Sequence, residues 1–299
     1  MILVAGEILF DHFPGYSRVG GAPFNFACHL GALGFDVRFL TRVGNDTEGA
    51  RAREMIAGRC LPPDLVQVDD IFPTGAVTVE LDGRGNPTFD IREGAAYDHI
   101  ALTPEAVDAA RNASMIYFGT LAQRTDRGAR TVGRLLEAAK RGTRIFCDIN
   151  LRPRCYSDGI IMRSLEMCGI LKLNIDELRY LKGMHGFIGD DADFTGFLAG
   201  KYTIDTVALT RGDRGSALFT GGGSWEAPPE EDVKVVDTVG AGDAYAAVLA
   251  AGILAGADPA ATVGAAARFA AKVCGIPGAL ADDDAFYDEV RGVLGRSHG

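Results

Sequence analysis

The sequence lacks the short motifs that mark several large classes of nucleotide- and metal-dependent enzymes. It contains no G-x-x-x-x-G-K-[ST] phosphate loop and no G-x-G-x-x-G fingerprint after its first apolar segment. Its five histidines include no H-E-x-x-H, and its six cysteines include no C-x-x-C pair. These absences disfavour a P-loop enzyme, a dinucleotide-dependent oxidoreductase and a zinc enzyme.

An excess of basic residues and long apolar runs are also missing. The 299 residues carry 30 Lys and Arg against 40 Asp and Glu, a formal net charge of −10, so we expect no nucleic-acid partner. No run approaches the roughly 18 apolar residues of a membrane span, and the apolar start at 2–5 has no basic leader, so we expect no membrane partner and no signal peptide. We expect a cytoplasmic protein whose cysteines are small, reduced core residues. They stand at positions 28, 60, 147, 155, 168 and 274.

Apolar runs of strand length alternate with helix-period segments along most of the chain, which is 47% hydrophobic. Continuous apolar strands are typical of a sheet that is buried on both faces, and helices between them are typical of parallel connections. We therefore predict an α/β fold, a doubly wound, mostly parallel sheet flanked by helices, in a single domain over residues 1–299. The predicted strands are 2–9, 37–41, 115–118, 145–149, 170–173, 207–210 and 217–219. The predicted helices lie near 22–33, 47–58, 126–141, 174–182, 241–255 and 259–273.

One segment interrupts this alternation. Residues 74–81 resemble a strand, 82–86 are rich in turn formers, and 88–91 resemble a second strand. The pattern predicts a hairpin where a helix is expected. We interpret this hairpin as a lid over a binding site, with a passive surface hairpin as the alternative.

The most informative stretch is D-T-V-G-A-G-D at 237–243, which leads into an apolar helix. Because Gly240 and Gly242 carry no side chains, consecutive main-chain N–H groups can point into one concavity at a helix N-terminus, where the macrodipole favours anions. Asp243 then stands beside an anion hole, where a carboxylate can take a proton from a hydroxyl that attacks a phosphoryl group. The alternative is an ordinary helix start with an aspartate in its first turn.

Polar residues gather where the predicted strands stop. In open α/β sheets, ligands bind outside the carboxyl ends of the strands, so we expect these residues to converge on one cleft. Each of them alone also has a structural explanation as a helix cap, a turn residue or a surface charge. The set comprises Asp11, Asn150, Arg152, Asn174, Glu177, Thr210, Arg211 and Gly212.

Taken together, these motifs resemble the ribokinase (PfkB) family of carbohydrate kinases from end to end. The D-T-V-G-A-G-D stretch is the most specific match, and G-G-A-P-F-N-F-A at 20–27 looks like the N-terminal signature of that family. Between them, in the order of the family, lie D-I-N-L-R-P at 148–153, K-L-N-I-D-E at 172–177 and T-R-G-D-R-G at 210–215. The resemblance implies a ribokinase-like fold with a small β lid built from segments near 11–20 and 72–96.

The resemblance also implies roles for individual residues. Asp243 would be the catalytic base, and Gly240, Ala241 and Gly242 would supply main-chain N–H groups to the charge that develops during transfer. The sugar would be held by carboxylate, amide and guanidinium groups and by glycines that let the ring approach the backbone. These substrate-binding residues would be Asp11, Gly20, Gly21, Asn25, Arg92 and Arg152, with Arg92 reaching the sugar when the lid closes.

The same resemblance places ATP and its cations. ATP would contact Asn174, Thr210, Gly212, Gly215 and Gly242. Glu177 would organise Mg²⁺ through water, because magnesium keeps much of its hydration. The main-chain carbonyls of Asp237 and Val239 would hold a monovalent cation, K⁺. The segment 266–278, which corresponds to the adenine-binding and potassium-binding loop of the family, is shorter here than in typical fructokinases.

Within the family, the bacterial fructokinase branch fits best. Its members open with a segment like G-E-I-L-F-D-H-F-P at 6–14 and share an element like I-R-E-G-A-A at 91–96. The resemblance therefore implies an ATP-dependent kinase that converts fructose to fructose 6-phosphate, and it allows a homodimer. Kinases of 2-keto-3-deoxygluconate, ribose, another ketose or a nucleoside remain alternatives, as does a regulator that binds sugar or nucleotide without catalysis.

Overall fold

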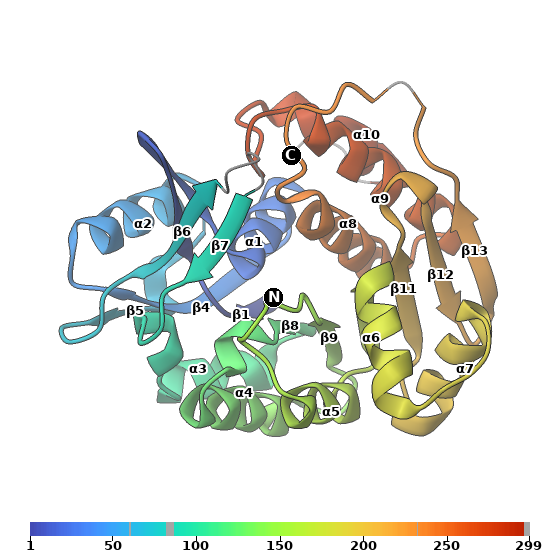
Figure 1. Cartoon of the computed structure of the whole chain (residues 1–299), viewed down its shortest axis with the longest axis horizontal. Helices are drawn as coiled ribbons and strands as arrows, with labels where there is room; N and C mark the ends of the chain where they lie inside the picture. Colours follow the sequence, from blue (N-terminus) through green and yellow to red (C-terminus); the bar gives the residue numbers. More distant parts are fainter. Residues whose placement is uncertain (60, 82–86, 232, 296–299) are drawn as a thin grey trace.

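The computed structural model describes residues 1–59, 61–81, 87–231 and 233–295. Its main sheet has nine strands in the order β13-β12-β11-β10-β9-β8-β1-β4-β5. From β11 to β5 all neighbours run parallel, whereas β12 and β13 are antiparallel additions at one edge (Figure 1). The strands are β1 (Ile2–Ala5), β4 (Val37–Gly44), β5 (Val66–Asp69), β8 (Met115–Gly119), β9 (Arg144–Asp148), β10 (Ile170–Asn174), β11 (Thr206–Thr210), β12 (Ser216–Thr220) and β13 (Gly223–Ala227).

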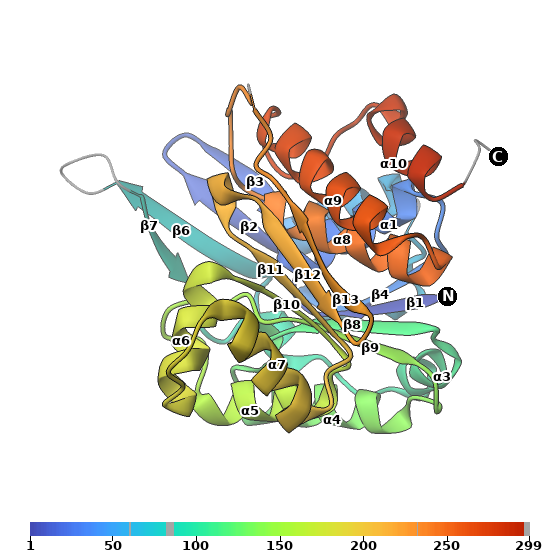
Figure 2. The same ribbon diagram turned by 90° about the vertical axis from the view of Figure 1, so that its right-hand side faces the viewer.

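Helices cover both faces of this sheet (Figure 2). One face carries α1 (Ala22–Ala32), α2 (Thr47–Gly58), α8 (Ala241–Ala255), α9 (Pro259–Cys274) and α10 (Asp288–Val293). The other carries α3 (Pro104–Asn112), α4 (Asp126–Ala138), α5 (Asp158–Met167), α6 (Ile175–His185) and α7 (Asp191–Tyr202). The predicted doubly wound, mostly parallel α/β sheet is thus confirmed.

The central strand β1 illustrates why these strands contain continuous apolar runs. Ile2 and Val4 pack into the core beneath α1, α8 and α9, and Leu3 packs into the core on the opposite face. All four side chains of β1 are buried, because the sheet has no solvent-facing side at this position. The strands β4 and β8 lie on opposite sides of β1 in the sheet, so the strand order reverses at β1. Open α/β sheets bind ligands at such a switch point.

The predicted strand 2–9 is wrong, because the chain leaves the main sheet after Ala5. Gly6 packs so closely on Pro23 that a Cβ at this position would lie 2.4 Å from the Cγ atom of the proline. The chain then starts β2 (Leu9–Phe13) in a second sheet. Asp11 therefore lies within a strand of that second sheet and not at the end of β1.

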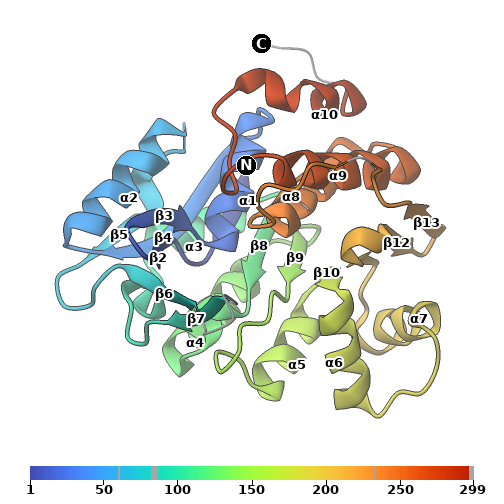
Figure 3. The same cartoon turned by 45° about the horizontal axis from the view of Figure 1, so that its top comes forward.

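The second sheet has four strands in the order β3-β2-β6-β7. It consists of β2, β3 (Tyr16–Gly20), β6 (Gly75–Leu81) and β7 (Pro87–Ile91). The hairpin predicted near 74–91 is β6 paired antiparallel with β7, and its turn at 82–86 lies outside the described residues. In Figure 3, α1 lies between this sheet and α8, and α1 packs directly on α8.

Helices α3, α5, α7 and α10 were not predicted from the sequence. The start of α3 carries a readable signal, since the Thr103 side chain accepts a hydrogen bond from the Ala106 N–H and Pro104 occupies the first turn. The helix α5 starts in the same way, with a hydrogen bond from the Ile160 N–H to Ser157 Oγ. These caps are clear locally, but α3 has nine residues and α5 has ten, so each apolar pattern extends over fewer than about three turns.

Three of the cysteines match the expectation of small core residues and two do not. Cys28, Cys147 and Cys168 are buried, whereas Cys155 and Cys274 are half-buried, and Cys60 lies outside the described residues. All five described cysteines are free thiols. No helix in the described part of the chain has the length and apolar character needed to cross a membrane.

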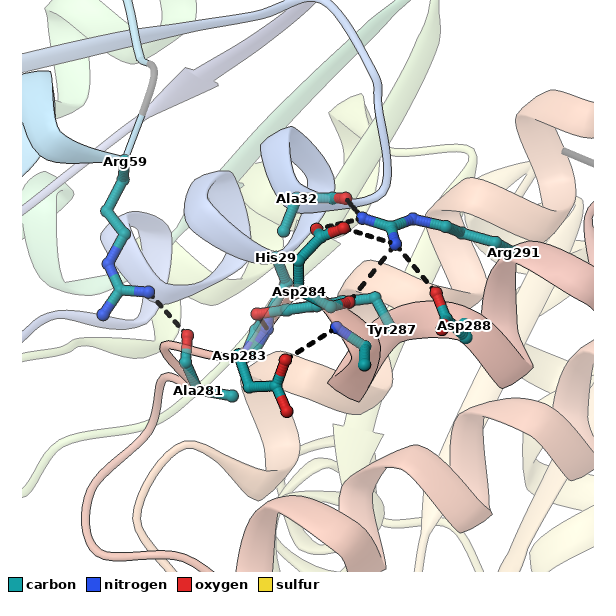
Figure 4. Close-up of polar contacts among 10 residues, drawn as sticks. His29, Ala32, Arg59, Ala281, Asp283, Asp284, Tyr287, Asp288 and Arg291 are labelled. Atoms are coloured by element: carbon teal, nitrogen blue, oxygen red, sulfur yellow. Dashed lines mark hydrogen bonds and ion pairs between the residues drawn. The ribbon is translucent and has the colours of Figure 1, made fainter. Parts of the chain in front are cut away.

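The segment after α9 returns to α1 and is fixed there by polar contacts (Figure 4). His29 Nδ1 lies 3.0 Å from the Tyr287 hydroxyl in the buried interior. A guanidinium N–H of Arg59 donates to the Ala281 carbonyl at 2.6 Å, and Arg291 donates to the Ala32 carbonyl at 2.7 Å. These contacts hold the loop near residue 279 in place, and this loop packs against the start of α8.

Candidate active site

The start of α8 is built from glycine for reasons of packing as well as charge. Gly240 is the N-cap with φ +81°, and a Cβ at this position would lie 2.2 Å from the Cβ atom of Ala279. In the described part of the chain, the N–H groups of Gly242 and Asp243 have no hydrogen-bond acceptor. Two free N–H groups at a helix N-terminus are the arrangement that the D-T-V-G-A-G-D stretch predicts, and groups of this kind can bind an anion. We call these two N–H groups the proposed anion site.

Asp243 stands in the first turn of α8 and is held from across the cleft. Asn25 on α1 donates a hydrogen bond from Nδ2 to Asp243 Oδ2 at 2.8 Å. Burial raises the pKa of Asp243, and the Asn25 hydrogen bond and the charges of Lys172 and Arg152 oppose that rise. A carboxylate that is desolvated but oriented by a neutral donor is well suited to accept a proton from a substrate hydroxyl.

The residues assigned to the sugar lie around the junction of β3 and α1. Asp11 is close to Gly20, because a Cβ on Gly20 would lie 2.8 Å from Asp11 Oδ2. Gly21 has φ +112° and packs on the main chain, where a Cβ would lie 2.6 Å from the Glu7 carbonyl oxygen. Burial raises the pKa of Asp11, with Arg152 the largest opposing charge. The structure thus brings Asp11, Gly20, Gly21 and Asn25 together near Asp243.

The two arginines assigned to the sugar are placed differently. Arg152 is exposed on the loop after β9, and its positive charge acts on both Asp11 and Asp243. Arg92 follows β7 and its charge acts instead on Asp46, and its guanidinium lies 3.5 Å from the Thr74 carbonyl oxygen. The structure therefore brings Arg152 to the site and leaves the Arg92 side chain turned toward α2.

A cavity of about 700 Å³ opens beside the start of α8. It is lined by all five residues assigned to ATP, namely Asn174, Thr210, Gly212, Gly215 and Gly242, together with Thr238, Ala241 and Tyr245. This volume lies within the range of small-molecule sites in proteins. The glycine at 215 is required by the chain itself, because φ is +80° and a Cβ would lie 2.2 Å from the Ala227 carbonyl oxygen.

Asn174 and Glu177 form a capping box at the start of α6. The Asn174 side-chain oxygen accepts from the N–H groups of Asp176 and Glu177, both at 2.9 Å. The two oxygens of the buried Glu177 accept from the N–H groups of Asn174 at 2.7 Å and Leu151 at 2.9 Å. Each oxygen keeps a lone pair that is free to accept a hydrogen bond from a metal-bound water. The contact of Glu177 to hydrated Mg²⁺ stays a prediction.

Asp237 connects three segments around the same helix start. Its Oδ2 accepts from Arg18 on β3 at 2.7 Å and from the Gly278 N–H at 3.1 Å, and its Oδ1 accepts from the Val239 N–H at 3.0 Å. The side chain therefore joins the second sheet, the loop after α9 and the start of α8. The monovalent cation on the carbonyls of Asp237 and Val239 stays a prediction.

Two charged residues of this site, Lys172 and Glu7, have no role predicted from the sequence. Lys172 lies within β10 and is buried with Asp148, the last residue of β9. Glu7 lies between β1 and β2, is 4% exposed, and its Oε2 has no hydrogen-bond partner among the described residues. Burial raises the pKa of Glu7 to about 7. The sequence does carry a signal for Lys172, because it is the one charged residue in an apolar strand. Charged residues are almost never buried without a partner.

Comparisons with known proteins agree with this geometry. Residues 16–285 match the profile of the pfkB family carbohydrate kinases. The chain is 30% identical to a fructokinase of Klebsiella pneumoniae over 270 residues, which cover 86% of each chain. It is 28% identical to a 2-dehydro-3-deoxygalactonokinase of Haloferax volcanii over 80% of this chain and 76% of that one.

A solved structure is similar over most of its length. The sugar kinase PH1459 of Pyrococcus horikoshii, solved in complex with ATP, superposes with a TM-score of 0.80 and 25% identity over 93% of this chain and 94% of that one. The architecture is therefore the ribokinase-like fold. On the family match, the relatives and the shared fold, the chain belongs to the PfkB family of carbohydrate kinases and is a phosphotransferase.

Proposed function

We propose that this protein transfers the γ-phosphoryl group of ATP to fructose and produces fructose 6-phosphate. The observation that carries the proposal is the position of Asp243. Asp243 stands in the first turn of α8, which carries the two free N–H groups, and Gly242 of the same turn lines the 700 Å³ cavity. Asn25 from the sugar side donates to the Asp243 carboxylate at 2.8 Å. A base and an anion site are thus adjacent.

The proposed reaction uses these groups in turn. The substrate hydroxyl gives its proton to the Asp243 carboxylate while its oxygen attacks the γ-phosphorus, and the bond from phosphorus to the β–γ bridging oxygen breaks to release ADP. The N–H groups of Gly242 and Asp243 stabilise the negative charge on the transferred group. Asp11 and the main chain at Gly20 and Gly21 hold the sugar hydroxyls.

Mg²⁺ would neutralise charge on the phosphates, and the residues present fit an ion that is held through water. Among the described residues, no three His, Cys, Asp or Glu side chains form a metal site. The ion would therefore be held chiefly by ATP and water, with Glu177 ordering a water from its capped position. We include K⁺ at the Asp237 and Val239 carbonyls in the proposal, to be tested by the potassium dependence of the rate.

Fructose is preferred because fructokinases recur among the relatives, although kinases of 2-dehydro-3-deoxy sugar acids are similarly close. We propose that the four-stranded sheet, with segments near 11–20 and 72–96, acts as a lid on the sugar. A homodimer stays part of the proposal.

The test is phosphorylation of a panel of about twenty sugars, sugar acids and nucleosides with Mg-ATP, followed by Asp243→Asn on the best substrate. We expect fructose to give the highest kcat/KM, and the variant to lose at least ~10²-fold in kcat with ATP and sugar binding retained. A different best substrate would replace fructose and leave the kinase assignment standing. No turnover with any member would favour a binding protein without catalysis, and near-normal turnover of the variant would remove Asp243 as the base.

A further inference from the structure

A buried lysine lies beside the anion site and has no role in the reaction described so far. Lys172 is the third residue of β10, where its neighbours are apolar, and only 5% of it is exposed. Its ammonium lies 3.1 Å from both carboxylate oxygens of Asp148. Burial opposes the charge of Lys172, but Asp148, Glu177 and Asp243 together raise its pKa above the ordinary value. The residue is therefore a fixed cation inside the protein.

The ammonium faces the start of α8. An ideally placed Cβ on Gly242 would lie 3.2 Å from Lys172 Nζ, so no atom separates the ammonium from this glycine. The same glycine lines the nucleotide cavity and carries one of the two free N–H groups. The ammonium, the helix N-terminus and the free N–H groups are thus three positive features around one point.

The hydrogen bonding of Lys172 leaves it one donor to use. An ammonium has three N–H groups, and among the described residues Asp148 is its only acceptor, with two oxygens. The carboxylates of Asp148, Glu177 and Asp243 all act on Lys172, and Arg152 is a second cation that acts on Asp148 and Asp243, so three carboxylates face two cations before ATP arrives. A phosphoryl group placed there needs a cation close to it, because Coulomb repulsion is strong where water is excluded.

We propose that Lys172 is a catalytic residue, which donates its remaining N–H to the phosphoryl group during transfer while Asp148 holds the ammonium in place. The inference rests on the proposed kinase function. Lys172 keeps its proton throughout, since the hydroxyl proton goes to Asp243 and the leaving group is ADP. Its contribution is electrostatic and is largest when charge accumulates on the transferred oxygens.

The competing explanation is that Lys172 only neutralises Asp148. Three variants separate the two explanations: Lys172→Gln, which keeps a donor for Asp148 without the charge, Asp148→Asn, and the double variant. Removing one partner of a buried pair leaves an uncompensated charge, whereas replacing both partners is often tolerated. We therefore expect the double variant to regain much of the thermal stability that either single change loses.

The kcat values of the three variants decide between the catalytic role of Lys172 and its role as a partner of Asp148. On the sugar that the wild-type protein phosphorylates best, we expect Lys172→Gln and the double variant both to lose ~10²-fold or more in kcat, as for other lost oxyanion donors. The variant Asp148→Asn should show a smaller loss in kcat than the two variants that lack Lys172. Recovery of the double variant to the rate of Asp148→Asn would overturn the proposal, because the lysine would then be needed only for its partner.

The ratio of two ligand affinities provides a measurement that a change in protein stability does not affect. Calorimetry compares ADP with ADP plus magnesium and aluminium fluoride, in the presence of the sugar. We expect both Lys172 variants to bind ADP within about threefold of wild type and to lose affinity for the fluoride complex by the same factor as kcat. Equal losses for both ligands would contradict a role in transfer. Failure of the wild-type protein to phosphorylate any sugar would instead reject the proposed function, so the two failures are distinguishable.

Discussion

Asn25 Nδ2 and Asp243 Oδ2 lie 2.8 Å apart, although the two residues are 218 positions apart in the sequence. The contact joins the first helix of the chain to the helix that carries the proposed base. Because Asn25 also belongs to the group around the proposed sugar site, one side chain contacts the base and borders the substrate. If both proposed roles are correct, this one side chain couples sugar binding to the strength of the base.

The first prediction concerns this coupling. The Asn25 hydrogen bond lowers the pKa of Asp243 against the rise caused by burial, so Asn25→Ala should raise that pKa. Asp243 must be deprotonated to act, so the acidic limb of the kcat/KM profile should move to higher pH. The sugar KM should also rise, because an unpaired buried hydroxyl costs roughly 1–3 kcal/mol.

Pre-steady-state or steady-state rates between pH 5 and 9 measure both effects, with nucleotide affinity as the control. If the acidic limb stays where it is while the sugar KM rises, Asn25 is a sugar ligand alone. A shift of the acidic limb with an unchanged sugar KM would mean that Asn25 acts only as a partner of Asp243.

The sheet and the free N–H groups at the start of α8 were readable from the sequence because both depend on local patterns. Apolar strands and the D-T-V-G-A-G-D stretch predict their own geometry, and α2 begins and ends where its periodicity places it, at Thr47 and Gly58. The strand predicted over 2–9 failed because the turn at Gly6 is set by contact with Pro23, which no local pattern records. A long apolar run does not show which sheet it belongs to.

Contacts within the site were less predictable than its members. The residue types at the strand ends suggested a cleft, and three of the eight, Asn174, Thr210 and Gly212, line the 700 Å³ cavity. The sequence could not show that Arg92 turns toward Asp46, or that Lys172 pairs with Asp148, because both pairings depend on the relative position of separate elements. The single charge of Lys172 within an apolar strand indicates a buried partner but does not identify that partner.

The second prediction separates the two glycines of the anion site. A methyl group on Gly240 would meet Ala279 at 2.2 Å and require a left-handed conformation, so Gly240→Ala should lower the melting temperature clearly. A methyl group on Gly242 meets only the end of the flexible Lys172 side chain, at 3.2 Å. Gly242→Ala should therefore fold normally and lose kcat. Thermal melts and kinetics on both variants test this, and a folded, fully active Gly242→Ala would exclude a phosphoryl group from that turn.

The third prediction concerns Glu177. Glu177→Gln should raise the magnesium concentration needed for half-maximal rate, because the amide orders a metal-bound water less strongly. It should also cost about 1–3 kcal/mol in stability, since both oxygens accept main-chain N–H groups and an NH₂ cannot. The matched control is Asp176→Asn, on the same helix turn but exposed. Loss of stability with an unchanged magnesium titration would leave Glu177 as a helix cap only.

The fourth prediction concerns the buried Glu7. Its pKa is about 7 in the folded protein against an ordinary 4.5, so the folded state binds more protons between these values and stability falls as pH rises through them. Glu7→Gln removes this effect. The variant should therefore have a free energy of unfolding up to about 3 kcal/mol higher than wild type at pH 8, but nearly the same as wild type at pH 4.5. Urea unfolding at the two pH values measures the difference, with the exposed Glu54→Gln as control. A gain that is independent of pH would show that Glu7 is charged throughout.

The last prediction concerns the four-stranded sheet as a lid. If it closes on the sugar, amide hydrogen exchange in β6 and β7 should slow when fructose is added to the protein with a non-hydrolysable nucleotide. The bond from Arg18 on β3 to Asp237 ties this sheet to the start of α8, so Arg18→Gln should reduce the protection and raise the sugar KM without weakening nucleotide binding. Arg134→Gln, an exposed arginine on α4, is the control.

The comparison between sugar and nucleotide makes the test specific. Protection produced by the nucleotide alone would mean that the start of α8 becomes ordered first and that the sheet follows it through Asp237. Protection that requires the sugar would place the closing contacts on Asp11 and its neighbours. Exchange that is unchanged by either ligand would mean that the sheet is a passive surface or a contact between copies of the chain, and the proposed lid would be rejected.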